Sequence, residues 1–345
     1  MTGKELKEIL EDSSPERTAA LFAEAYRVKK ETVGECVYLR GLVEISNICR
    51  KNCLYCGIRR DNSSTGRYEL DSAVVMEAAG FAAAEGYGSL VIQGGERTDR
   101  KFIDKITELL VEIKRKWPLG ITLSLGEQPE EVYREWFEAG AHRYLLRIES
   151  STRELYEKIH PVDSVHSFGT RLRALENLRK CGYQVGTGVM IGLPFQNAAH
   201  LADDLLFFRS MDIDMCGMGP YLEHSETPLY AYRNLIPSKE RRLELSLKMV
   251  ALLRLLMPDI NIAATTAMQV LAPDGRERAI MAGANVLMPN LTLSEVREEY
   301  QIYQNKPGVG EDAALSSSST EERLRKMKIP IGYGRWGDSL HFSKR

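Results

Sequence analysis

The sequence predicts an α/β protein built as a (β/α)8 TIM-type barrel, with N-terminal helices and a C-terminal extension that closes the barrel. Three observations support this fold class. Eight apolar segments, typical of strands in a parallel sheet, alternate with amphipathic helical segments. Glycines mark many of the helix-to-strand junctions, and glycine ends a helix at low cost. The alternation extends over about 250 residues, which is the usual size of such a barrel.

Each predicted element follows from its local pattern. Ser14 and Pro15 form a helix start signal, and they divide residues 4–32 into two predicted helices. The predicted strands lie near residues 37–46, 88–93, 121–125, 142–148, 184–191, 214–220, 260–264 and 284–288. The predicted helices between them lie near residues 71–86, 101–116, 130–139, 167–181, 198–210, 238–256 and 274–282. Beyond the last strand, a Gly/Ser-rich stretch at 308–319 precedes a predicted charged helix at 320–328.

These elements divide the chain into three parts. Residues 1–32 form an N-terminal helical extension, residues 33–290 form the barrel, and residues 291–345 form a C-terminal extension that closes it. The alternative is an open or partial barrel of six units, which leaves the last two strands as an extension. In both arrangements ligands bind at the C-terminal ends of the strands, so we look for functional residues there.

The composition excludes several classes of protein. Hydrophobic residues make up 43% of the chain and charged residues 27%, as in soluble globular proteins. A net charge of −2 favours neither a nucleic-acid partner nor a membrane surface. We find no apolar run long enough to span a bilayer, and the first ten residues do not resemble a signal peptide. We therefore expect a cytoplasmic protein, in which thiols stay reduced.

Three of the six cysteines lie within eight residues, after the first predicted strand. Cys49, Cys53 and Cys56 have the spacing C-x3-C-x2-C. Thiolates suit iron–sulfur clusters and zinc, but a closed structural zinc site needs a fourth ligand nearby. The next cysteine is Cys181, and the next histidine is His142. Three thiolates on a four-iron cluster leave one iron open to a small molecule. Packed thiols or a zinc site are the alternative.

This spacing, with Tyr55 before the last cysteine, resembles the motif of the radical S-adenosylmethionine (SAM) family. The resemblance implies one [4Fe-4S] cluster on the three cysteines and a SAM molecule bound to the open iron. Gly94, Gly95 and Glu96 follow the second predicted strand, where this family holds the amino group of SAM. Glycines let a backbone approach a ligand closely, although a simple tight turn is the alternative.

Charged residues end the fourth predicted strand. Arg147 and Glu149 are two positions apart, so strand alternation places both on one face. If that face is the barrel lumen, the two buried charges need each other or a ligand. A carboxylate there suits ribose hydroxyls, and Arg147 or Arg171, at the start of the following helix, suits a carboxylate. A structural ion pair is the alternative.

Further polar residues are expected to converge on the lumen, where they would suit a small anionic or polar substrate. We assign Ser124, at the end of the third strand, to the SAM-binding set. The candidate substrate residues are Arg40 on the first strand, Thr265 and Thr266 at the end of the seventh, and Tyr300 and Tyr303 beyond the eighth.

Longer segments resemble the radical SAM maturases of FeFe hydrogenase, over roughly residues 1–305. These segments are residues 45–62, 122–127, 144–147, 263–268 and 283–290. The resemblance implies reductive cleavage of SAM to a 5′-deoxyadenosyl radical, in the assembly of the diiron subcluster of the hydrogenase active site. It implies a small-molecule or iron-complex substrate, a reductant such as ferredoxin or flavodoxin, and other maturation proteins as candidate partners.

Two alternatives to this function stay open. One is another radical SAM enzyme of the biotin synthase or methylornithine synthase type, which would insert sulfur or rearrange an amino acid. The other is an iron–sulfur electron carrier, although a carrier gains nothing from an open iron. The sequence also departs from several of the resembling maturases, which carry three further tail cysteines that bind a second cluster. Residues 311–320 contain no cysteine, so we expect no second protein-ligated cluster.

Overall fold

The computed structural model describes residues 1–308 and 310–345, and in this part of the chain eight parallel strands form the wall of a barrel. Their order around the sheet is β10-β1-β2-β3-β4-β5-β7-β9. The strands are β1 (Tyr38–Ser46), β2 (Ser89–Gly94), β3 (Gly120–Ser124), β4 (Arg143–Leu145), β5 (Gln184–Thr187), β7 (Met215–Cys216), β9 (Asn261–Ile262) and β10 (Val286–Leu287). A parallel bridge between Ala263 and Val286 brings the two ends of the sheet together. The predicted (β/α)8 barrel is therefore confirmed.

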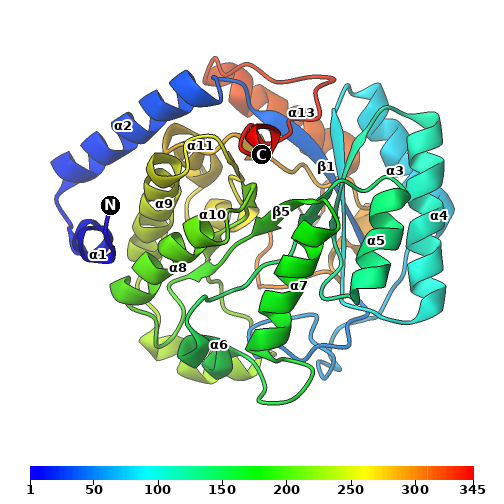
Figure 1. Cartoon of the computed structure of the whole chain (residues 1–345), viewed down its shortest axis with the longest axis horizontal. Helices are drawn as coiled ribbons and strands as arrows, with labels where there is room; N and C mark the ends of the chain where they lie inside the picture. The colour runs from blue at the N-terminus through cyan, green and yellow to red at the C-terminus, as the bar shows by residue number, and fades with distance from the viewer. Residues whose placement is uncertain (309) are drawn as a thin grey trace.

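Helices surround this wall, with α3, α4 and α5 on one side and α8 and α9 on the other (Figure 1). The helices before β5 are α1 (Gly3–Glu11), α2 (Pro15–Thr32), α3 (Ser72–Ala84), α4 (Arg100–Lys116), α5 (Glu130–Glu138), α6 (Arg153–Ile159) and α7 (Phe168–Lys180). Those after β5 are α8 (Ala198–Ser210), α9 (Lys239–Leu256), α10 (Thr266–Leu271), α11 (Gly275–Met281), α12 (Ser294–Arg297) and α13 (Ala313–Lys326), with 3-10 helices η1 (Pro228–Leu235) and η2 (Phe342–Lys344).

The two N-terminal helices lie outside the barrel. The side chain of Ser14 accepts a hydrogen bond from the backbone N–H of Arg17, and Pro15 is the first residue of α2, as the start signal predicted. Helix α1 packs against α8, and α2 packs against α9. Two side chains of α9 bind the end of α1: Arg241 donates to the carbonyl of Leu10 at 2.7 Å, and Lys248 donates to the carbonyl of Asp12.

Two predicted strands are interrupted. The fifth, at 184–191, divides into β5 and β6 (Met190–Ile191), and the sixth, at 214–220, divides into β7 and β8 (Gly219–Pro220). The interruption falls at Gly188, where a Cβ atom would lie 2.1 Å from the carbonyl oxygen of Gly217. There the chain pairs instead with Glu149, whose N–H donates to the carbonyl of Gly188 at 3.0 Å. The C-terminal parts of the two predicted strands, β6 and β8, form a separate two-stranded ladder.

The C-terminal segment, residues 331–345, lies across the N-terminal ends of the strands. Ile331 bridges to Val37, which directly precedes β1. The carbonyl of Gly337 accepts hydrogen bonds at 2.9 Å from Arg40 on β1 and from Asn261 on β9. In Figure 1 the C-terminus accordingly lies near the upper edge of the barrel, and α6 lies at the lower edge.

The tail contains one element that the prediction placed wrongly. Helix α13 begins at Ala313, inside the predicted Gly/Ser-rich stretch, and not at residue 320. Asp312 caps it by accepting a hydrogen bond from the backbone N–H of Leu315 at 2.7 Å. Ser317 is buried and accepts from the hydroxyl of Tyr87 at 2.8 Å. Capping and packing thus outweigh the weak helix propensity of serine.

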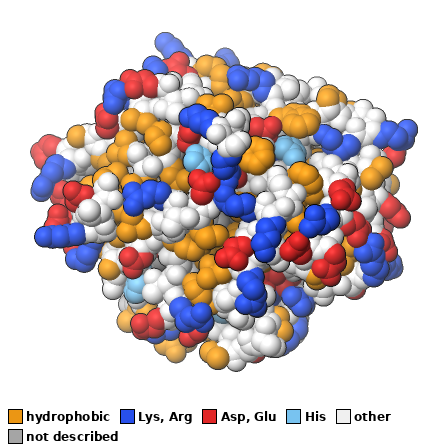
Figure 2. Space-filling model, in the orientation of Figure 1, with side chains coloured by type: hydrophobic (Ala, Val, Ile, Leu, Met, Phe, Trp, Pro, Cys, Tyr) orange, Lys and Arg blue, Asp and Glu red, His pale blue; other side chains and the backbone are white. Residues whose placement is uncertain are grey.

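The visible surface in Figure 2 carries basic and acidic side chains interspersed with apolar ones, in keeping with the small net charge. Among the described residues, no helix is both long and apolar enough to cross a membrane.

Candidate functional site

The three clustered cysteines lie in a loop after β1, at the end of the barrel opposite the C-terminal segment. We call residues 47–57 the cysteine loop. Its backbone is fixed by three neighbouring segments. Leu54 donates to the carbonyl of Ile159 at 3.1 Å and accepts from the N–H of Leu229 at 2.9 Å, and Gly57 donates to the carbonyl of Ile302 at 3.0 Å. The loop is therefore hydrogen-bonded to segments from three other parts of the chain.

The thiols are in an environment that opposes their ionisation. Burial raises the pKa of all three cysteines, and that of Cys53 reaches about 12. The neighbouring cysteines contribute to the shifts at Cys53 and Cys56, so the three thiols lie close to one another. Three buried thiolates would repel each other unless iron compensated their charge, and thiolate is the usual ligand of iron–sulfur clusters. The donor set fits a [4Fe-4S] cluster held by three cysteines.

The turn after β2 packs directly against the cysteine loop. The N–H of Gly95 donates to the carbonyl of Ser46 at 2.8 Å, and the N–H of Glu96 donates to the Sγ of Cys49 at 3.3 Å. A Cβ atom on Gly95 would lie 2.3 Å from the carbonyl oxygen of Ile48 and 2.9 Å from the Cβ of Cys49. This close approach requires glycine at position 95. It therefore favours a turn that packs closely against the site over a simple tight turn.

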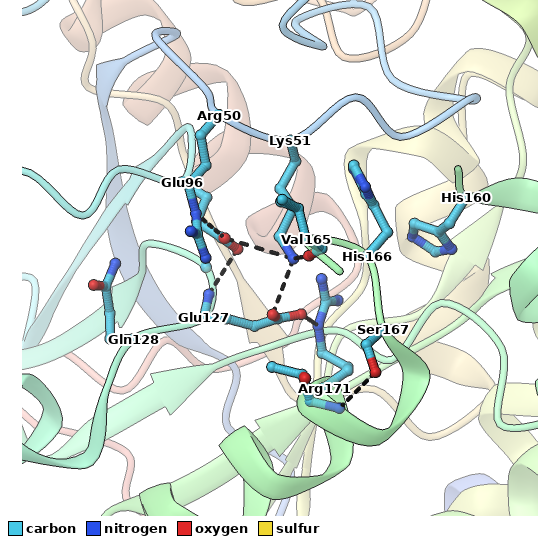
Figure 3. Close-up of polar contacts among 12 residues, drawn as sticks. Arg50, Lys51, Glu96, Glu127, Gln128, His160, Val165, His166, Ser167 and Arg171 are labelled. Carbon is cyan, nitrogen blue, oxygen red and sulfur yellow. Dashed lines mark hydrogen bonds and ion pairs between the residues drawn. The ribbon is translucent and has the colours of Figure 1, made fainter. Parts of the chain in front are cut away.

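A network of charged side chains, of which all but Arg50 are buried, connects the cysteine loop to the barrel (Figure 3). We call Arg50, Lys51, Glu96, Glu127 and Arg171 the loop network. Glu96 accepts from Arg50 at 2.8 Å, Glu127 accepts from Lys51 at 2.9 Å, and Arg171 binds the other oxygen of Glu127. Burial opposes ionisation of Glu127, but the charges of Arg171 and Lys51 outweigh it and lower the pKa of this carboxyl. The side chains of Glu96 and Arg171 thus have partners within the protein.

Arg147 and Glu149 lie together, although not for the predicted reason. Strand β4 ends at Leu145, because the N–H of Ile148 donates to the hydroxyl of Thr187 and not to a ladder carbonyl. Glu149 has a φ of 65°, which is rare for a residue other than glycine and is typical of functional sites. Its Oε2 lies 2.9 Å from an Arg147 nitrogen.

This pair has unused polar capacity. Within the described residues, Arg147 Nε is buried and has no hydrogen-bond partner, and Glu149 Oε2 has only its ion pair with Arg147. Burial raises the pKa of Glu149 in spite of the nearby Arg147 and Arg171. Buried polar groups without partners are costly, so the pair is better suited to a ligand than to a purely structural role.

Most of the other predicted residues also lie on the side of the cysteine loop. Ser124 ends β3 beside Gln93 of β2, and Gln93 donates to the hydroxyl of Tyr300 at 3.3 Å. Thr265 and Thr266 follow β9, and the hydroxyl of Thr265 donates to the carbonyl of Met218 at 3.3 Å. Tyr303 is partly buried, and burial raises the pKa of its hydroxyl.

Arg40 lies on the first strand, as predicted, but apart from the other candidate substrate residues. Arg40 is the third residue of β1, and its guanidinium contacts the carbonyl of Gly337 and the sulfur of Met215. It faces the lumen, where it lines a cavity of about 20 Å³, roughly the space of one water molecule. However, it lies at the end that the C-terminal segment closes. Arg40 is therefore not grouped with the other candidate substrate residues.

Sequence reasoning missed two basic residues at the site. Lys51 is not among the predicted site residues, yet its side chain is 4% exposed and contacts two carboxylates. Lys306 pairs with the buried carboxylate of Glu44 and lies over the ring of Tyr300, 5.0 Å from its centroid. The signal that could have identified Lys306 is Glu44, a lone acidic residue in an apolar strand that needs a buried partner.

A parallel α/β barrel with three thiols in the loop after β1 has the architecture of a radical SAM protein. In agreement, residues 43–208 match the model of the Radical SAM superfamily. The "[FeFe] hydrogenase maturase subunit HydE" of Thermotoga maritima is 45% identical over 306 residues, which cover 88% of this chain and 84% of that protein. The chain therefore belongs to the HydE family of radical SAM enzymes.

Two solved structures have the same fold. The FeFe-hydrogenase maturase HydG from Carboxydothermus hydrogenoformans superposes with a TM-score of 0.81 at 20% identity, over 96% of this chain and 76% of that one. Methylornithine synthase (PylB) superposes with a TM-score of 0.79 at 22% identity, over 96% and 94% of the two chains. At these identities the likeness concerns the fold alone.

Proposed function

We propose that the protein cleaves SAM reductively at a [4Fe-4S] cluster and acts in assembly of the diiron subcluster of the FeFe-hydrogenase active site. The observation that carries the proposal is the cluster of three thiols at the mouth of the barrel, where Cys53 is buried, Cys49 and Cys56 are partly buried, and Cys49 packs against the Gly95 turn. The identity of 45% to the HydE relative supports the choice of pathway.

The residues around the thiols have separate tasks. When held by Cys49, Cys53 and Cys56, the cluster would supply one electron to cleave SAM into methionine and a 5′-deoxyadenosyl radical. The backbone of Gly94, Gly95 and Glu96 would orient the amino group of SAM, and Ser124 belongs to the same SAM-binding set. Glu149 accepts hydrogen bonds from the ribose hydroxyls, and Arg147 and Arg171 attract the carboxylate.

The segment 299–306 excludes water from this mouth. Its backbone contacts two segments: Asn47 and Gly57 of the cysteine loop donate to the carbonyls of Glu299, at 2.7 Å, and Ile302, and Gln304 donates to the carbonyl of Glu223 at 3.3 Å. A reactive radical needs such closure, which prevents side reactions. We assign the substrate to the space between this segment and Thr265, Thr266, Tyr300 and Tyr303.

The substrate proposed is a small molecule or an iron complex, and the reductant is a ferredoxin or flavodoxin. Other hydrogenase maturation proteins are the candidate partners. We propose a single protein-ligated cluster, because helix α13 carries serines in the tail region where several of the resembling maturases carry three cysteines. A cytoplasmic location suits the reduced thiols that the cluster needs.

Anaerobic reconstitution with iron and sulfide, followed by electron paramagnetic resonance, tests the proposal. The reduced wild-type protein is expected to show one [4Fe-4S] signal that changes when SAM is added. Cys53→Ala should lose the signal, whereas Cys181→Ala, at a buried thiol outside the cysteine loop, should retain it. A [4Fe-4S] signal that does not change when SAM is added, or one that is retained in Cys53→Ala, refutes the proposal. A hydrogenase-activation assay then tests the pathway.

A further inference from the structure

Lys51 is a buried cation inside the cysteine loop. It lies between Cys49 and Cys53 in sequence, but its side chain is only 4% exposed, whereas that of the adjacent Arg50 is 42% exposed. Lys51 Nζ lies 2.9 Å from Glu127 Oε2 and 3.6 Å from Glu96 Oε1, and it also donates to the carbonyl of Val165. A lysine in a solvated loop would not need these partners.

The two carboxylates come from different strand ends and are joined to each other. Glu96 follows β2, and Glu127 follows β3. Glu96 Oε2 accepts the backbone N–H of Glu127 at 2.8 Å, so the two turns keep a fixed relation. Lys51 therefore ties the cysteine loop to the β3 turn by a charge-assisted hydrogen bond, which is the stronger kind, and to the β2 turn by an ion pair.

Glu127 also reaches the opposite side of the site. Its Oε1 accepts from Arg171 on α7, and Arg171 in turn donates to the carbonyl of Arg147. One carboxylate thus lies between Lys51 of the cysteine loop and Arg171 of α7 (Figure 3). A change at either cation alters how strongly Glu127 holds the other.

We propose that Lys51 is a positioning residue that fixes the cysteine loop and, through Glu127, fixes Arg171 for the ligand. The second part rests on the proposed function, because there Arg171 attracts the carboxylate of SAM. The first part does not, since it concerns the loop of the protein alone. The three cations and two carboxylates of the loop network leave one positive charge in excess, which suits an anionic group nearby.

The first experiment uses the protein before cluster loading. Lys51→Met removes the charge and keeps the length of the side chain. Under anaerobic conditions, alkylation of Cys49, Cys53 and Cys56 by iodoacetamide is expected to quicken about tenfold, because the loop opens more often. The matched control is Arg60→Met, which removes an exposed cation that, among residues 1–308 and 310–345, pairs with the adjacent Asp61. Equal alkylation rates in the two variants overturn the proposal.

Lys51→Arg covers the case in which Lys51→Met does not fold, as judged by circular dichroism. The guanidinium keeps the charge but has a different shape, so it cannot reproduce the three contacts of the ammonium. Alkylation faster than in Arg60→Met supports the role of Lys51, and alkylation at the Arg60→Met rate overturns it.

The second experiment measures coupling in the reconstituted protein. Equilibrium binding of SAM is compared for wild type, Lys51→Met, Arg171→Met and the double variant. Because both cations act on Glu127, the two losses of affinity are expected to be non-additive, and additive losses overturn the coupling. A wild type that takes up no cluster or binds no SAM refutes the proposed function instead, and it leaves the alkylation result standing.

Discussion

Gly95→Ala tests whether the close contact between the β2 turn and the cysteine loop is needed for the cofactor. The added Cβ would lie 2.3 Å from the carbonyl oxygen of Ile48, whereas real Cβ atoms keep at least 3.0 Å. The loop backbone must therefore move by about 0.7 Å next to Cys49, more than the tolerance of roughly 0.2 Å in metal–ligand distances. Overpacking of this kind also costs about 1–3 kcal/mol of stability.

The expected result is a folded protein that binds less iron and sulfide after reconstitution and has a lower affinity for SAM. Iron and sulfide analysis, thermal unfolding and equilibrium SAM binding measure these effects. The control is Gly169→Ala, in α7, where the added Cβ meets other atoms only at 3.5 Å or beyond. Full cluster content and unchanged SAM affinity in Gly95→Ala would refute the argument that this contact positions the site.

Other predictions concern the charges that hold the fold. Arg143→Met should lower the free energy of unfolding by about 2–4 kcal/mol, because Asp338 and the buried hydroxyls of Thr122 and Ser89 lose their partner. Urea unfolding measures the loss, and Arg173→Met, at an exposed site, is the control. Burial opposes ionisation of Asp338, but the hydrogen bond from His142 and the charge of Arg143 lower the pKa of its carboxyl. The stabilisation by Asp338 is therefore present above pH ~4 and lost in more acid solution. Asp338→Asn should weaken this loss of stability in acid. Burial lowers the pKa of Lys29 to about 7, and its Nζ has no hydrogen-bond partner among the described residues. The native state then binds fewer protons than the unfolded state between pH 7 and roughly 10, so stability rises over that range, and Lys29→Met should remove the rise.

The sequence was sufficient to predict the barrel, because strands buried on both faces leave apolar runs of a recognisable length. The start of each predicted main strand agrees with the structure to within two residues. The interruption at Gly188 and the early end of β4 were not predictable, since both depend on contacts between distant segments. Likewise, α13 owes its first turns to the cap at Asp312 and to the packing of Ser317 beneath Tyr87.

The candidate site could be located only partly. The rule that ligands bind at the C-terminal ends of the strands correctly placed the cysteines, the Gly95 turn and the Arg147–Glu149 pair on one side of the barrel. It failed for Arg40, because alternation gives the face of a residue but not its height in the lumen. It also could not separate Lys51 from Arg50, two adjacent cations, since the carboxylates that bury one of them come from distant strand ends.

The pairing of the first strand with the last has a consequence for synthesis of the protein. Tyr38 pairs with Val286, 248 positions later, so the wall cannot close until most of the chain has left the ribosome. Such long-range pairing is slow. Ile302, which covers the loop by accepting from Gly57, emerges later still. The cysteine loop therefore cannot form its contact with Ile302 until nearly the whole chain has been synthesised.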